Sequence, residues 1–219
     1  MSPTSDVLFQ LKHVRYRDVL SIDQFDIFAG QITCIIGSSG GGKTTLLRLL
    51  AKLISPDSGS IMIHNTLLSE RDSVVHRREV ALLSQHPILF PGTVAENLRI
   101  GRQIEGKETA DSLLYDVLKT VRLKHPLDAD VAHFSGGEAQ RLALARVLLL
   151  DRPVILLDEP SSALDEDTEK LIIETVVTTV KKQRKTLIMA THSIHEARRH
   201  ADVIVQLENG RLKGREDHA

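Results

Sequence analysis

The chain has 219 residues, of which 42% are hydrophobic, and it carries 28 basic and 29 acidic side chains. This composition is typical of an ordered globular protein and excludes intrinsic disorder as the main state, while the length suits one domain with a small subdomain. Because the net charge is only −1, there is no global basic field for a phosphate backbone, and we expect no nucleic-acid partner.

Cysteine content and hydropathy indicate the cellular compartment in which the chain is expected. The one cysteine, Cys34, excludes an internal disulfide and a cysteine-built metal site, which favours a reducing compartment. No apolar run approaches the ~20 residues that a membrane-spanning helix needs. Residues 1–6 also lack the basic and apolar blocks of a signal peptide. We therefore expect a cytoplasmic protein, unless a partner brings it to a membrane.

The pattern of apolar residues predicts an α/β fold. The first 30 residues alternate and predict an antiparallel β layer. Farther along, short apolar runs typical of buried strands are separated by longer helical stretches, which predicts a mostly parallel sheet covered by helices. The expected strands are 32–36, 154–157, 187–190 and 203–207, and the expected helices are 43–53, 111–121, 138–150 and 166–182. The turn-rich stretch from about 86 to 134 reads as a mainly helical insertion.

A glycine-rich segment after the first buried strand fits the P-loop pattern G-x-x-x-x-G-K-[ST]. It comprises Gly37, Ser38, Ser39, Gly40, Gly41, Gly42, Lys43 and Thr44, with Thr45 continuing the helix. Glycines permit close backbone approach, and N–H groups at a helix N-terminus attract phosphate. We expect Lys43 to reach the β- and γ-phosphates and Thr44 to ligate Mg²⁺. The alternative, a flexible glycine turn, would not require Lys-Thr directly after it.

Two carboxylates end the strand predicted at 154–157. Asp158 is placed to bind Mg²⁺, directly or through water, and Glu159 to orient and deprotonate an attacking water. The alternative is a polar strand end, but adjacent carboxylates repel each other without a cation. A P-loop in the same chain favours the metal site.

A serine and two glycines precede the apolar helix predicted at 138–150. Ser135 and Glu138 fit a capping box, which is a sufficient structural reason for both residues. Gly136 and Gly137 are not explained by a cap, since adjacent glycines raise the entropic cost of ordering the helix start. They are explained if another group must approach the backbone there.

Three motifs together resemble the nucleotide-binding domain of ATP-binding cassette (ABC) proteins. They are the P-loop at 37–44, the signature motif at 134–141 and the Leu-Asp-Glu-Pro segment at 157–165. The resemblance covers the whole chain, with a core at 7–84 and 151–219 and a helical subdomain at about 86–150. By position, Gln85 matches the Q-loop, Asp165 the D-loop and His192 the switch histidine.

The resemblance implies a head-to-tail pair of cassettes that hold two ATP molecules between them. Each ATP would lie on the P-loop of one subunit and against Ser135 and Gly137 of the other. Glu159 is the implied general base, His192 contacts the γ-phosphate, and Gln85 senses Mg²⁺. Asp165 would act across the dimer interface. Without the resemblance, Gln85 and His192 would each be interpreted as ordinary structural residues.

The chain departs from the common family pattern at two places. The signature motif has Phe134 and Glu138 where Leu and Gln are commonest. The aromatic residue that stacks on adenine usually lies about two positions after Tyr16, where this chain has Asp18. Tyr16 is either the stacking residue, brought into place by a shortened hairpin, or a residue that packs on the sheet.

The resemblance identifies an ATPase subunit but does not identify the solute or the process that it drives. We expect a separate polytopic membrane subunit, bound around residues 85–98, a second copy of the cassette, and a position on the inner face of the cell membrane. No regulatory C-terminal domain is expected after 202–207. The compactness of the chain and the segments 14–16, 53–59 and 85–90 are similar to small bacterial cassettes linked to iron export.

Two alternatives stay open from sequence. One is a soluble assembly ATPase similar to the cassette of iron–sulfur cluster assembly. The other is a membrane-associated cassette that transmits force without moving a solute. DNA-repair and translation-factor cassettes are disfavoured, because the former carry long insertions and the latter two domains per chain.

Overall fold

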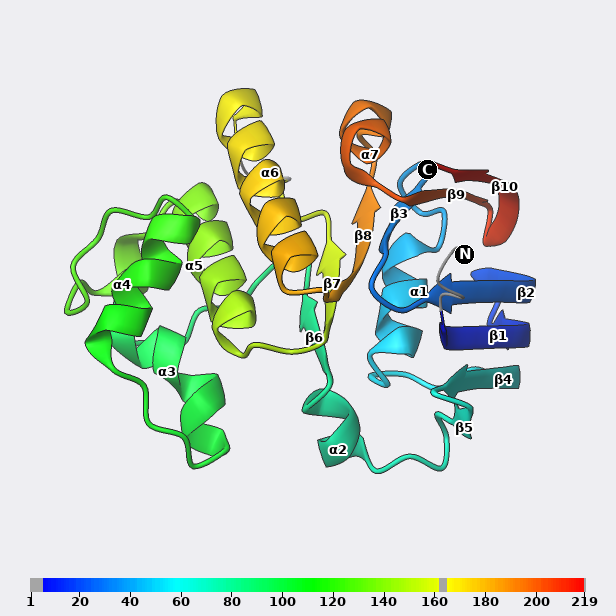
Figure 1. Ribbon diagram of the computed structural model, residues 1–219, viewed down its shortest axis with the longest axis horizontal. Helices are drawn as coiled ribbons and strands as arrows, with labels where there is room; N and C mark the ends of the chain where they lie inside the picture. The colour runs from blue at the N-terminus through cyan, green and yellow to red at the C-terminus, as the bar shows by residue number, and fades with distance from the viewer. Residues whose placement is uncertain (1–5, 162–164, 219) are drawn as a thin grey trace.

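The computed structural model describes residues 6–161 and 165–218, which form two sheets with helices around them (Figure 1). The central sheet has six strands in the order β10-β9-β3-β8-β7-β6, and a second sheet has four strands in the order β2-β1-β4-β5. The strands are β1 (Val7–Tyr16), β2 (Leu20–Phe28), β3 (Ile32–Ile36), β4 (Ser58–Ile63), β5 (Thr66–Leu67), β6 (Val80–Leu83), β7 (Val154–Asp158), β8 (Thr186–Thr191), β9 (Val203–Glu208) and β10 (Arg211–Asp217).

The central sheet is parallel from β9 to β6, and only β10 pairs antiparallel, to β9. The second sheet is antiparallel throughout. The predicted α/β class with an N-terminal antiparallel layer is therefore confirmed. The sequence analysis did not predict β4, β5, β6 or β10.

Seven α-helices and one 3₁₀ turn are found among the described residues. They are α1 (Lys43–Leu50), α2 (Ser73–Arg77), α3 (Val94–Ile104), α4 (Asp111–Thr120), η1 (Val131–His133), α5 (Gly136–Leu149), α6 (Glu166–Lys182) and α7 (Ile194–His200). Figure 1 shows α3, α4 and α5 gathered at one end of the molecule, away from the four-stranded sheet at the other. Among these helices, none is both long and apolar enough to cross a membrane.

Each buried strand contributes to two cores. On β3, Cys34 packs with the helical side of the sheet, whereas Ile35 packs with α1 and the antiparallel sheet. On β7, Leu157 packs on the helical side of the sheet, and Leu156 packs with α1 and the antiparallel sheet. Burial on both faces explains why these strands read as continuous apolar runs. It also fixes their register, since a shift by one residue would exchange the two faces.

Candidate functional site

The predicted site residues meet at one edge of the central sheet. The P-loop follows β3, Asp158 and Glu159 stand at the end of β7, His192 follows β8, and Gln85 follows β6. Because β3, β8, β7 and β6 are parallel neighbours, their carboxyl ends share an edge. This edge is where open α/β sheets bind ligands.

The P-loop wraps against the backbone of β9 and the β1–β2 hairpin. A Cβ atom added at Gly37, where φ is +155°, would lie 2.0 Å from the Leu207 carbonyl oxygen. Gly42 is the N-cap of α1 with φ of 99°, in the left-handed region that favours glycine. These two positions therefore require glycine for steric and conformational reasons.

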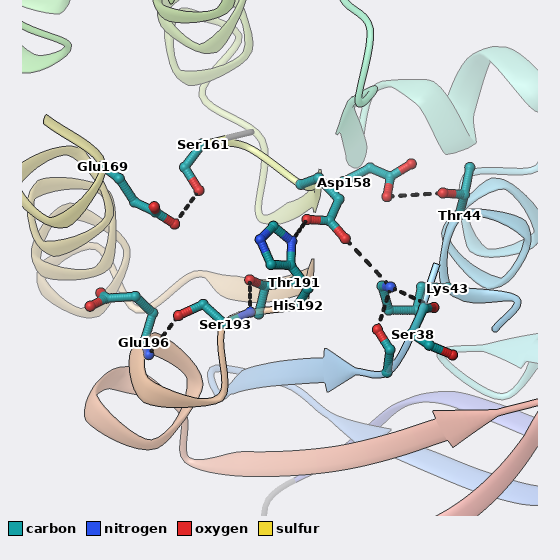
Figure 2. A network of polar contacts seen from close by, with 12 residues as sticks. Ser38, Lys43, Thr44, Asp158, Ser161, Glu169, Thr191, His192, Ser193 and Glu196 are labelled. Atoms are coloured by element: carbon teal, nitrogen blue, oxygen red, sulfur yellow. Dashed lines mark hydrogen bonds and ion pairs between the residues drawn. The ribbon is translucent and has the colours of Figure 1, made fainter. Parts of the chain in front are cut away.

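Lys43 is 6% exposed, and its ammonium group lies inside the loop. Nζ donates to the carbonyl oxygens of Gly37, at 2.7 Å, and Ser38, at 3.1 Å, and lies 3.4 Å from Glu159 Oε1. Figure 2 shows Lys43 extended between Ser38 and the end of β7. The cation is thus held by groups of the chain itself, at the place where phosphate oxygens would be bound.

Glu159 contacts both the P-loop and the residue that follows β8. Its Oε2 lies 2.6 Å from His192 Nδ1, and its Oε1 faces Lys43. The residue has φ of 48°, and its backbone is fixed by donation to the Ala190 carbonyl and by Gln140 Nε2, 3.3 Å from the Glu159 carbonyl. A non-glycine residue in this conformation costs roughly 1–3 kcal/mol, so it persists only where the surroundings impose it.

Asp158 and Thr44 form the second contact between β7 and the P-loop. The Thr44 hydroxyl donates to Asp158 Oδ1 at 3.1 Å, as Figure 2 shows. Asp158 is 3% exposed, and burial raises the pKa of its carboxyl group, an effect that the Thr44 hydrogen bond opposes. A buried carboxylate beside a hydroxyl is a pair of hard oxygen ligands.

A cavity of about 180 Å³ opens over the P-loop, and we call it the phosphate cavity. Its described lining residues are Val19, Ser39, Gly40, Gly41, Gly42, Lys43, Thr44, Thr45, Gln85 and Glu159. The structure therefore brings most of the predicted phosphate-binding residues together with Gln85 and Glu159. Val19 was missed by the sequence analysis, and only its place in the β1–β2 hairpin would have indicated it.

Tyr16 is absent from the described lining of the phosphate cavity. It pairs with Leu20 across the β1–β2 hairpin, packs partly against the core, and lies under the Arg17 guanidinium, 5.2 Å from the ring centroid. Of the two interpretations left open by the sequence, sheet packing is the one that these contacts describe. Adenine stacking on Tyr16 stays a prediction.

The signature motif lies apart from the phosphate cavity of its own chain, since none of the cavity's described lining residues comes from 134–141. Ser135 caps α5 in a capping box with Glu138, and Ser135 and Gly136 are exposed. Asp165 likewise caps α6, and hydrogen bonding from Thr168 lowers the pKa of its carboxyl group. The surface thus exposes Ser135, Gly136 and Asp165 fully and Gly137 and Glu138 in part.

Gln140 is a further polar residue that the sequence analysis missed. It is 2% exposed and links α5 to the backbone of Glu159. The signal was available, because a glutamine on the buried face of an otherwise apolar helix needs a hydrogen-bond partner. It connects the helix that follows Ser135 to the backbone at the end of β7.

Comparison with known proteins decides the family. The ABC transporter family matches residues 20–162 of this chain. The chain belongs to that family. Two curated relatives agree: ABC transporter I family member 17 of Arabidopsis thaliana is 39% identical over 200 residues, which cover 85% of this chain and 72% of the relative. Protein STAR1 of Oryza sativa is 37% identical over 206 residues, and there the match covers 94% of this chain but only 60% of STAR1.

One similar solved structure of the same family is that of a dimer. It is the ATP-binding cassette MJ0796 as a dimer in a post-hydrolysis state, bound to ADP and Pi, and it superposes with a TM-score of 0.85 at 25% identity. The match covers 96% of this chain and 98% of that one. The similarity to this cassette therefore extends over nearly the whole chain.

Proposed function

We propose that this chain is the ATP-binding and ATP-hydrolysing subunit of an ABC transporter. Two cassettes pair head to tail around two ATP molecules and drive a separate polytopic membrane subunit at the cytoplasmic face of the membrane. The observation that carries the proposal is the position of Glu159, whose two carboxylate oxygens contact Lys43 and His192 at the edge of the phosphate cavity. Membership of the ABC transporter family supports it.

Phosphate binding replaces contacts that Lys43 makes within the chain. The γ-phosphate takes the place of the Gly37 and Ser38 carbonyls as the partner of Nζ, and the backbone N–H groups of the loop and the α1 N-terminus hold the β-phosphate. Once Lys43 binds phosphate, Glu159 Oε1 loses its cation and is available to a water molecule. Binding of the substrate thus prepares the base.

The site is suited to Mg²⁺. Within residues 6–161 and 165–218 no cluster of three or more His, Cys, Asp and Glu side chains could hold a metal, and we expect the substrate to supply part of the ion's ligands. Asp158 and the Thr44 hydroxyl fit this pattern, since Mg²⁺ is usually bound through one or two carboxylates together with phosphates and water. Gln85, at the rim, would contribute its amide oxygen. When bound, the ion neutralises charge that develops on the phosphate oxygens.

Hydrolysis requires one proton transfer by the chain. Water attacks the γ-phosphorus, Glu159 accepts its proton, and the bond to the β–γ bridging oxygen breaks to give ADP and phosphate. His192 lies 2.6 Å from Glu159 Oε2 and so orients the carboxylate with Oε1 toward the cavity. The exposed His192 ring then faces the γ-phosphate.

The second half of each ATP site comes from another copy. Ser135 and the N-terminus of α5 are exposed and lie outside the phosphate cavity of their own chain, which supports their use by a partner. The hydroxyl and the helix dipole both favour an anion there. Asp165, exposed at the start of α6, would lie across the same interface.

The replacement Glu159→Gln tests the proposal. It removes the proton acceptor but keeps size and hydrogen bonding, so turnover should fall about 10²–10⁴-fold while ATP binding is retained. With Mg-ATP the variant should sediment as a dimer, and it should return to monomer when ATP is withdrawn. Turnover near the parent rate, or no ATP-dependent dimer, would contradict the proposal. A polytopic membrane protein captured from detergent-solubilised cells with the ATP-bound variant is the expected partner.

A further inference from the structure

The signature motif has one contact that neither helix capping nor the ATP site explains. His125 lies in the turn between α4 and η1, and its Nε2 is 2.6 Å from Glu138 Oε1. The same ring stacks on Phe134 with centroids 4.5 Å apart. A titratable side chain is therefore held against the first turn of α5 from a segment ten residues upstream of Ser135.

The hydrogen bonds of Glu138 define which atoms carry protons. The pKa of its carboxyl group is lowered to about 2 by hydrogen bonds from the Ser135 hydroxyl first and then from His125. At neutral pH the carboxylate can only accept, so His125 Nε2 must be the donor to Oε1. For the same reason the Ser135 hydroxyl must donate to Oε2, 2.7 Å away. The one hydroxyl proton of Ser135 is thus already in use.

A second capping box in the chain shows that the histidine is not needed for capping. At the start of α3, Thr93 and Glu96 make the same three contacts, at 2.7, 3.1 and 3.2 Å. The corresponding distances between Ser135 and Glu138 are 2.9, 2.7 and 3.3 Å. Among the described contacts of Glu96, however, none comes from a histidine. The histidine is an addition to the signature box, and its role lies elsewhere.

The addition matters if a phosphate approaches Ser135, which is the part of this inference that rests on the proposed function. The Glu138 carboxylate would then stand one helical turn from another anion, and it would compete with the phosphate for the Ser135 proton. A positively charged His125 beside Oε1 weakens both effects. Its charge offsets that of the carboxylate and draws electron density away from Oε2.

We propose that His125 is a positioning residue that sets the charge of the signature motif. When His125 is protonated, it neutralises Glu138, and the Ser135 hydroxyl turns to the partner's γ-phosphate. When His125 is neutral, Glu138 keeps the hydroxyl and repels the phosphate. Closure of the ATP-bound dimer is therefore favoured when His125 carries a positive charge and disfavoured when it does not.

Other charged groups occupy the elements that meet here. Lys124 and Asp128 are exposed on the same turn, His133 is exposed on η1, and Arg141 lies one turn along α5. Among the ion pairs of the described residues, Glu138 has His125 alone as its partner. The field of Arg141 acts instead on Asp165. His133 is the titratable group nearest in sequence to Ser135 and serves as the control.

The test is a dimerisation constant measured against pH. In a Glu159→Gln background with saturating Mg-ATP, sedimentation is followed at pH 6, 7 and 8. His125→Gln keeps a donor for Oε1 but cannot become charged, and His125→Asn is a second variant with the same property. We expect the parent dimer to weaken about tenfold from pH 6 to 8, with contributions from both copies of His125 in the dimer. His125→Gln should be weak throughout, and His133→Gln should follow the parent.

A double variant shows whether His125 acts through Glu138. Glu138→Gln should give a strong dimer without the pH step, and His125→Gln should then change nothing further. The proposal is overturned if His125→Gln keeps the parent's pH dependence, or if it still weakens the dimer when residue 138 is glutamine. Because His192 is present in every variant, the readout is the difference between each variant and the parent at the same pH. If none of the proteins dimerises with ATP at any pH, the proposed function itself fails.

Discussion

The two halves of the proposed ATP site satisfy their polar groups in opposite ways. Around the P-loop, Lys43, Asp158 and Glu159 are all at least nine-tenths buried, and each has a partner in the same chain. Around the signature motif, Ser135 is exposed, and the side-chain hydrogen bonds it makes with described residues lie within its own helix cap. The first half is a formed cavity, while the second is an exposed surface, as expected if another copy of the chain brings its ligand.

The difference teaches where each half gets its rigidity. The P-loop is positioned by four parallel strands whose register is fixed by burial on both faces. The signature motif is positioned by one helix end and by the turn that carries His125. Substitutions in the first half should therefore affect binding and folding of a single chain, and substitutions in the second should mainly affect the pair.

Lys43→Ala should have the largest effect, because it removes the cation that the phosphates would meet and leaves buried Glu159 without a counter-charge. ATP hydrolysis, followed by phosphate release, should fall by about 10²–10³-fold or more. Lys170→Ala is the matched control, since Lys170 is exposed on α6 and far from the cavity in sequence. Turnover close to the parent rate in Lys43→Ala would remove the P-loop from the mechanism.

Ser135→Arg should inactivate the second half while leaving the first intact. The variant alone should bind ATP as a monomer but hydrolyse it slowly, because the long side chain blocks the partner's phosphate. Mixed in equal amounts with Lys43→Ala, it should recover about a quarter of the parent activity, since half of the dimers are mixed and each has one complete site. A mixture no more active than its components would mean that both sites must work together, or that they are not shared.

Gly37→Ala tests the packing of the first half. Its Cβ would meet the Leu207 carbonyl, and the free energy of unfolding should fall by about 3 kcal/mol in a denaturant titration. Gly106→Ala is the matched control, because Gly106 also has a positive φ, of 69°, but nothing lies within 4 Å of the added atom. Its loss should be about 1 kcal/mol. Equal losses would show that the contact with β9 does not hold the loop.

Glu138→Gln should give the smallest change, a loss of about 1 kcal/mol in unfolding free energy at neutral pH from a weakened capping box. The pKa of Glu138 is about 2 in the folded chain against an ordinary 4.5. A lowered pKa stabilises the folded state above 4.5, and this contribution is lost as the pH falls toward 2. The two proteins should therefore converge in acid. Glu96→Gln, which alters the box without a histidine, should show a smaller pH-dependent difference.

Local sequence patterns were sufficient for much of the fold. The strand at 32–36 and the helix at 166–182 were predicted with the bounds that the structure shows, because long apolar periodicity and charged helix ends are local signals. The P-loop could be identified for the same reason, because its glycines, lysine and threonine lie close together in the sequence. Strands β4, β5, β6 and β10 were not predicted from the sequence.

Sequence by itself determined the class of fold, the ABC resemblance and the residue types that bind phosphate, since each depends on neighbours along the chain. Only the tertiary structure decided that Val19 lines the phosphate cavity, that Gln140 supports Glu159, and that His125 contacts Glu138. These contacts join residues from different elements. Their existence depends on how helices and strands pack, and no periodicity within one segment encodes that.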